Sequence, residues 1–141
     1  MGCTPPVKTV TLAIRTVVYS KGGSPNDSEV FVLSPDSLMQ IAPMLEKVRG
    51  TLRVENATAN FQGQMVFQTT SDGESWDSPQ NIGSAQSVGG SEKELYYTSD
   101  WTSIANTKRG IRFGVTAAGI NASSNPEFAR VSVILDLMMY A

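Results

Sequence analysis

One stretch, FQGQMVFQTTSDGESWDSP from Phe61 to Pro79, constrains the fold of this 141-residue chain more than any other. Its first half alternates with the period of two that a half-buried β-strand requires. One face carries Phe61, Gly63, Met65, Phe67 and Thr69, and the other carries Gln62, Gln64, Val66 and Gln68. The Asp72-Gly73 pair then predicts a tight turn, because both residue types tolerate a positive φ. We expect the ring of Trp76 to be buried under this turn, where it would anchor the returning chain.

Alternation of the same kind recurs along most of the chain and predicts about eight strands. They cover residues 7–19, 29–33, 48–54, 61–69, 81–87, 95–98, 111–117 and 128–140. The segment 81–87 has the weakest pattern, because it is rich in small polar residues. The connections lack the long crossover segments that parallel strands need, so we expect antiparallel pairing.

One segment has a helical pattern. Ser34 and Pro35 indicate a helix start, with Ser34 as the N-cap and Pro35 at the first helical position. Apolar residues at helical spacing follow, which predicts a short helix from Pro35 to about Leu45. The alternative is a loop that places Leu38 and Ile41 in the core, and the sequence leaves it open.

A chain of this length suits one domain with one core. An immunoglobulin-like sandwich would require a tryptophan between paired cysteines, and Cys3 is the chain's single cysteine. We therefore predict an all-β fold, an antiparallel eight-stranded jelly-roll sandwich with at most one short helix. Residues 1–6 are expected to form an extended N-terminal arm, because Pro5-Pro6 favours an extended backbone, and residues 7–141 a single domain.

The composition argues against several classes of function. Histidine is absent, which removes the commonest general base and metal ligand and every Ser-His-Asp or Cys-His nucleophile. A formal net charge of −2 without a long basic run argues against direct binding to nucleic acid. No segment has the length of a membrane span. We expect no enzyme, no cofactor and no metal, although a glycosidase stays open because spacing cannot show whether Glu92, Glu94 or Asp100 meet.

The turn after the central strand has two functional interpretations. Residues 70–76 resemble the Asp-box of sialidase-like propellers, but they have one residue fewer between the aspartate and the tryptophan, and the motif occurs once. Asp72, Glu74 and Asp77 could also offer oxygen ligands to Ca²⁺. Acidic residues around an exposed turn are more often solvated, so we favour a plain turn whose aspartate caps its own backbone.

Two further regions are candidate binding surfaces. Trp101, Tyr96 and Tyr97 could form an aromatic platform for a sugar, as in a jelly-roll carbohydrate-binding module, although neighbouring tyrosines on a strand point to opposite faces. The C-terminal stretch 134–141 is apolar on both faces, so it is either central in its sheet or covered by a partner, and we expect a homodimer there. The candidate protein-interface residues are Thr4, Pro5, Pro6, Lys21, Trp101, Leu137, Met138, Met139 and Tyr140.

Three segments carry a family resemblance: FQGQMVFQTTSDGESWDSP, then IRFGVTAAG at 111–119, then ARVSVILDL at 129–137. In this order they resemble the small jelly-roll decoration, or cementing, proteins of tailed-bacteriophage capsids, over roughly residues 46–141. The resemblance implies a virion protein, made in the host cytoplasm, on the outside of an icosahedral head. Its partners would be the major capsid protein, whose subunits it bridges, and a second copy of itself.

Overall fold

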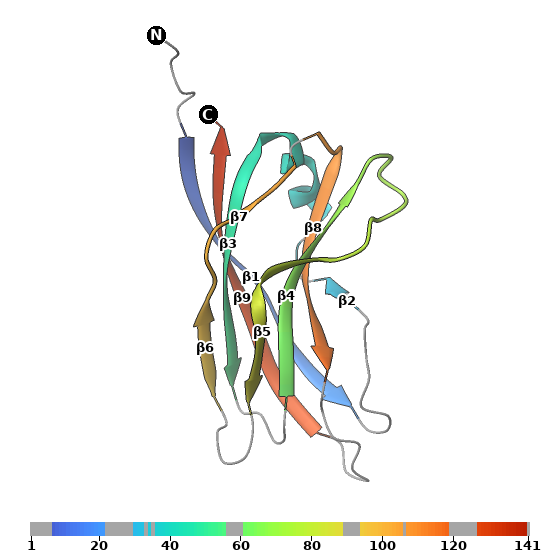
Figure 1. Cartoon of the computed structure of the whole chain (residues 1–141). Coiled ribbons are helices and arrows are strands. Elements are labelled where there is room, and N and C mark those ends of the chain that lie inside the picture. The colour runs from blue at the N-terminus through green and yellow to red at the C-terminus, as the bar shows by residue number, and fades with distance from the viewer. Residues whose placement is uncertain are drawn as a thin grey trace.

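Two antiparallel β-sheets pack face to face in the computed structural model, which describes residues 7–21, 30–32, 34, 36–55, 61–88, 94–105, 107–118 and 127–140 (Figure 1). The elements are β1 (Val7–Lys21), β2 (Val30–Val32), the 3₁₀ helix η1 (Asp36–Met44), β3 (Leu45–Glu55), β4 (Phe61–Thr70), β5 (Gln80–Val88), β6 (Leu95–Thr98), β7 (Thr102–Ser103), β8 (Gly110–Ala118) and β9 (Glu127–Tyr140). Within the described ranges, no helix is long and apolar enough to span a membrane.

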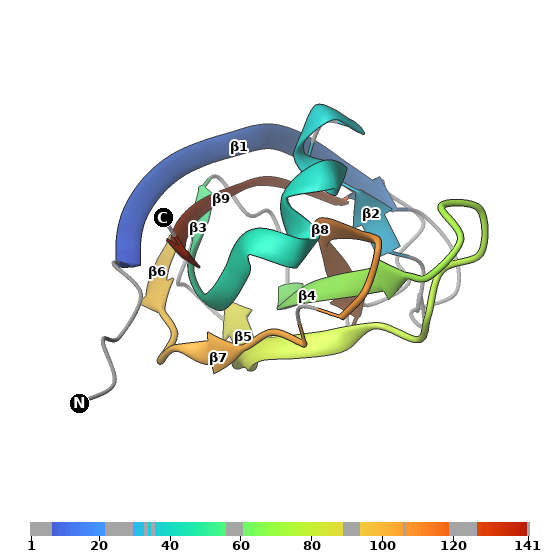
Figure 2. The same ribbon diagram turned by 90° about the horizontal axis from the view of Figure 1, so that it is seen from above.

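The strands follow a nested order. The first sheet runs β1-β9-β3-β6, with the two-residue β7 also paired to β3, and the second runs β2-β8-β4-β5. With β7 set aside, the first strand pairs with the last, the second with the next to last, and so on inward to β4 and β5. This nested pairing is the jelly roll, and the view along the sandwich shows its two layers (Figure 2). The predicted fold class is therefore confirmed.

The core between the sheets is apolar, and β9 contributes to it along most of its length. Val131, Val133, Leu135 and Leu137 alternate inward as predicted, and each is at most 3% exposed. Phe67 on β4 and Phe113 on β8 are the largest fully buried side chains that face them. Strand β9 is paired on both edges, with β1 and with β3, which accounts for its apolar character without a second chain.

The predicted short helix is present, from Asp36 to Met44, but it is a 3₁₀ helix. Strand β3 begins at the next residue. Ala42 is fully buried, and Ile41 is half-buried and packs against the core. Ser34, the predicted N-cap, accepts a hydrogen bond from the backbone N–H of Phe113 at 2.9 Å, so its hydroxyl ties the start of this segment to β8.

Strand β5 contains a bulge at Gly83, which has a φ of +71°. Gly63 pairs with Gln86 and Met65 with Ile82, so residues 83–85 face one residue of β4, Gln64. The amide of Gln64 donates to the carbonyls of Ile82 at 3.2 Å and of Gly83 at 3.4 Å. The hydroxyl of Tyr97 accepts the N–H of Ser84 at 3.1 Å. The side chains of Gln64 and Tyr97 thus form hydrogen bonds with backbone groups that the bulge removes from the pairing between β4 and β5.

Replacing Gly83 by alanine should destabilise the fold by about 2–4 kcal/mol, because two costs add. A Cβ at this position would lie 2.6 Å from the hydroxyl of Tyr97, in a backbone conformation that L-residues disfavour. Gly73 is a matched control, since its φ is +83° and a Cβ there would have no atom within 4 Å, so Gly73→Ala should cost only about 1–2 kcal/mol. Urea unfolding measures both. If both variants lose the same free energy of unfolding, the predicted clash with the Tyr97 hydroxyl does not contribute.

Candidate functional site

The turn after β4 is held by its own aspartate. One carboxylate oxygen of Asp72 accepts the backbone N–H groups of Glu74 and Ser75, both at 2.8 Å, and the hydroxyl of Thr70 at 3.0 Å. The two N–H groups, that of Ser75 first, and then the Thr70 hydroxyl lower the pKa of Asp72 from 3.8 to about 2. The favoured interpretation of this segment, an aspartate that caps its own backbone, is confirmed.

Trp76 is not buried in the core, contrary to prediction. Its ring is half-exposed and stacks against the guanidinium of Arg112, whose carbon lies 4.2 Å from the ring centroid. Arg112 in turn donates to the side-chain oxygen of Gln68 at 2.9 Å, and the Gln68 amide donates to the carbonyl of Asp77 at 3.1 Å. The segment that leaves β4 therefore folds back over the outer face of its own sheet (Figure 1). This explains why Gln68, on the face of β4 opposite to Phe67, is buried.

A lysine pairs with one carboxylate of the acidic turn. Asp77 accepts the hydroxyl of Thr69 at 2.7 Å and faces the ammonium of Lys108 at 3.1 Å, and these groups lower the pKa of Asp77. Lys108 also donates to Ser71 at 3.2 Å. A cation at Asp77 would have to displace this lysine. Within the ranges that the structure describes, no three Cys, Asp or Glu side chains are grouped so that they could hold a metal ion.

The outer face of the first sheet carries a cluster of four side chains, called here the Arg49 cluster: Thr11, Arg49, Trp101 and Asp136. The sheet register places Thr11 and Arg49 on either side of Asp136. Asp136 accepts Thr11 at 2.7 Å with one oxygen and Arg49 at 2.8 and 3.0 Å with the other. The Arg49 guanidinium lies 4.6 Å from the ring centroid of Trp101. Burial alone would raise the pKa of Asp136, but the bonds from Thr11 and Arg49 outweigh it, and the pKa is lowered.

The sequence-predicted interface residues lie in different environments. Leu137 is fully buried in the core, so its apolar character needs no partner. Met139 is half-buried and packs against the core, while Met138 and Tyr140 are half-buried. Trp101 is half-exposed beneath Arg49. Lys21 ends β1, its side chain lies outside the described residues, and so do Thr4, Pro5 and Pro6.

The predicted aromatic platform is divided between two faces. Tyr96 is 69% exposed, whereas Tyr97 is half-buried, with its hydroxyl on Ser84 of the opposite sheet. Sequence reasoning did not find Arg49, Asp136 or Arg112. Asp136 could have been noticed in the sequence, because it is an isolated charge at an outward position of an otherwise apolar strand.

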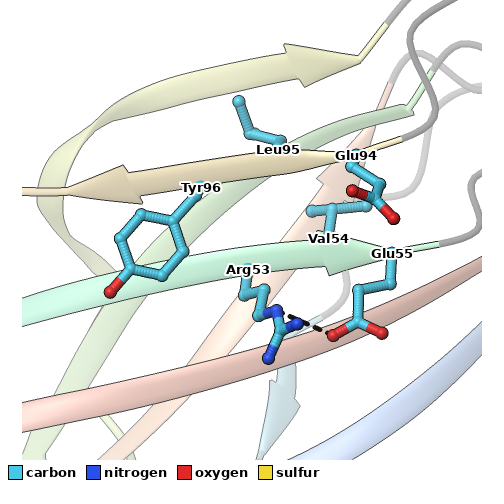
Figure 3. Close-up of a pocket in the computed structure, with 6 residues that line it drawn as sticks. All are labelled: Arg53, Val54, Glu55, Glu94, Leu95 and Tyr96. Carbon is cyan, nitrogen blue, oxygen red and sulfur yellow. Dashed lines mark ion pairs between the residues drawn. The ribbon is translucent and has the colours of Figure 1, made fainter.

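An open hollow of about 450 Å³ lies where β3 ends and β6 begins (Figure 3). Arg53, Val54, Glu55, Glu94, Leu95 and Tyr96 line it. Arg53 and Glu55 form an ion pair at 2.7 Å, and the register sets Arg53 opposite Tyr96. Glu94, one of the acids whose position the sequence could not settle, therefore shares this hollow with Glu55.

Comparison with known proteins identifies the fold and no family. No protein-family model matches the chain, and no curated protein matches it. A chain of the infectious bursal disease virus Gx strain structure aligns with a TM-score of 0.59 and 9% identity, over 98% of this chain and 32% of that one. The VP2 subviral particle of that virus aligns with a TM-score of 0.63 and 8% identity, over 95% of this chain and 33% of that one. The Gt strain structure aligns with a TM-score of 0.60 and 8% identity, over 96% of this chain and 33% of that one. The chain thus spans about a third of the length of those proteins.

Stability should fall as the pH decreases from about 4 to about 2. The pKa of Asp72 is depressed in the folded protein, so the stability that it contributes is present above its unfolded value of 3.8 and is lost as the pH approaches about 2. Asp72→Asn should reduce the dependence of stability on pH in this range. A smaller dependence should remain, because the pKa values of Asp77 and Asp136 are also lowered. Melting temperature measured by circular dichroism across this range is the test. Glu74→Gln in the same turn is the control, and an unchanged profile in Asp72→Asn would contradict the assignment.

Trp76→Ala should cost about 1–2 kcal/mol, because a half-exposed ring stacked on a guanidinium contributes far less than a core aromatic. Phe67→Ala, at 2% exposure, should cost about 3–5 kcal/mol. Chemical denaturation of both variants measures the difference. A loss for Trp76→Ala as large as that for Phe67→Ala would restore the prediction of a core residue.

Proposed function

We propose that this chain is a structural capsid protein that decorates the outside of an icosahedral phage head and joins neighbouring major capsid subunits. The observation that carries the proposal is the jelly-roll strand order, which aligns over 95–98% of the chain with chains of virus-particle structures. The resemblance of residues 46–141 to phage decoration proteins supports the finer assignment.

The part of the first sheet's outer face around the Arg49 cluster is the docking surface in this proposal. Part of the second sheet's outer face, around Gln68, is covered by the chain itself through Trp76 and Arg112. The first sheet, by contrast, presents exposed side chains at Thr9, Thr11 and Thr98. A partner that covers this face would bury surface that the fold leaves in water.

The Arg49 cluster is the expected centre of the contact. Tryptophan and arginine dominate the binding energy of many protein interfaces. Arg49 is already held by Asp136 and stacked on Trp101, so little side-chain freedom is lost when a partner binds. Met138 and Tyr140, half-buried on β9, are the C-terminal residues left for the proposed homodimer, because Leu137 belongs to the core.

Decoration stabilises a shell by mass action. A protein that binds the assembled head and not its isolated subunits adds its binding free energy to the stability of the head. Many symmetry-related copies make a modest contact effective, since each copy joins two or more subunits.

The experiment adds the chain to undecorated heads assembled from the major capsid protein of the same virus, and measures occupancy by co-sedimentation. Trp101→Ala should reduce occupancy about tenfold or more, the effect of losing one interface hot spot. Trp76→Ala is the matched control, because it removes the same kind of arginine–tryptophan stack from the other sheet. Deleting residues 1–6, the expected arm, should leave the domain folded and weaken attachment.

Three results would contradict parts of this proposal. If neither wild type nor variants bind heads, decoration is wrong. If the chain alone assembles into closed particles, it is a shell-forming subunit instead. If Trp76→Ala and Trp101→Ala lower occupancy equally, the first sheet is not the docking face.

A further inference from the structure

The hollow where β3 ends and β6 begins is separate from the Arg49 cluster and is not used by the proposed contact. Its six lining residues come from two neighbouring strands of one sheet and from the residue directly before β6 (Figure 3). Val54 and Leu95 pack in or against the core, so the side chains that the hollow offers to a ligand are those of Arg53, Glu55, Glu94 and Tyr96. Strand pairing holds Arg53 and Tyr96 opposite each other, and this part of the site is pre-organised.

An exposed aromatic ring is the first component of the hollow. Tyr96 is 69% exposed, and Met44 is the other large hydrophobic side chain that is exposed in the described part of the chain. The face of a tyrosine ring carries negative partial charge and attracts polarised C–H groups. A flat ring left in water beside a hollow is suited to stack on a flat ligand that presents such C–H groups.

Fixed hydrogen-bonding groups are the second component. Arg53 donates through Nε to Glu55 at 2.7 Å, and this pair orients a guanidinium and a carboxylate beside the ring. Glu94 adds a second, exposed carboxylate. The hollow thus combines donors and acceptors with the ring of Tyr96.

We propose that this hollow binds a neutral pyranose sugar, stacked on Tyr96 and hydrogen-bonded through its hydroxyl groups to Glu55, Glu94 and Arg53. A pyranose has the C–H face that the ring requires and hydroxyls that both donate and accept. About 450 Å³ lies within the usual range for small-ligand sites and is ample for one or two sugar rings.

Charge selects among the possible ligands. The two carboxylates outnumber the single guanidinium, so the hollow is net negative at neutral pH and disfavours uronic and sialic acids. A basic side chain of a protein partner fits less well, because Arg53 already occupies the place beside Glu55. A neutral sugar is therefore the favoured occupant, and the site would let the protein adhere to a glycan independently of its attachment to a shell.

Saturation-transfer NMR and calorimetry with glucose, galactose, mannose and N-acetylglucosamine test the proposal, and glucuronate is the anionic comparator. We expect at least one neutral sugar to bind and glucuronate to bind more weakly. Tyr96→Ala should weaken binding about tenfold, while Tyr96→Phe retains it. Met44→Ala, an exposed substitution far from the hollow, is the matched control and should bind as wild type does. Circular dichroism checks that each variant is folded.

Failure of this proposal is distinct from failure of capsid decoration. Tyr96→Ala should lose sugar binding and keep wild-type occupancy on heads. No binding of any of the four neutral sugars, or equal binding by wild type and Tyr96→Ala, would overturn the sugar site. Loss of head occupancy in Tyr96→Ala without sugar binding by wild type would also overturn it, and would assign the hollow to a protein contact.

Discussion

The burial of one apolar face of β9 against the opposite sheet is the constraint on which the rest of this structure depends. Leu135 and Leu137 are fully buried, and they belong to the same apolar cluster as Phe67 and Phe113 from the second sheet. Because β9 is paired on both sides, its inner face sets the position of β1 and β3 as well. The chain has one cysteine, so no internal disulfide can add to the stability that this core provides.

The outer faces of the two sheets differ in how the chain covers them. Each carries an arginine stacked on a tryptophan, Arg112 with Trp76 and Arg49 with Trp101. On the second sheet the stack belongs to a segment that returns over β4 and buries Gln68, so it completes the fold. On the first sheet, Asp136 holds Arg49 in the stack, and the stack lies at the surface among exposed residues. The same interaction is therefore structural on one face and available to a partner on the other.

The proposed roles use separate parts of the first sheet. The Arg49 cluster involves β1, β9, β3 and the segment between β6 and β7, whereas the hollow lies where β3 ends and β6 begins. A rigid jelly roll suits both, because side chains fixed on paired strands keep their geometry when a ligand or a shell binds. The fold alone does not specify either function, since jelly rolls carry many functions, and only the side chains on its outer faces can decide between them.

The amino-acid sequence by itself determined the strands, their antiparallel pairing and the inward face of β9, because two-residue alternation is a local property that neighbouring residues carry together. It also determined the turn at Asp72, whose hydrogen bonds join residues at most three apart. Tertiary structure alone decided that Trp76 stacks on Arg112, that Asp136 meets Thr11 and Arg49, and that Glu55 and Glu94 share a hollow. These contacts join residues far apart in the sequence, and they exist only because the nested strand order brings those strands together, which no local spacing reveals.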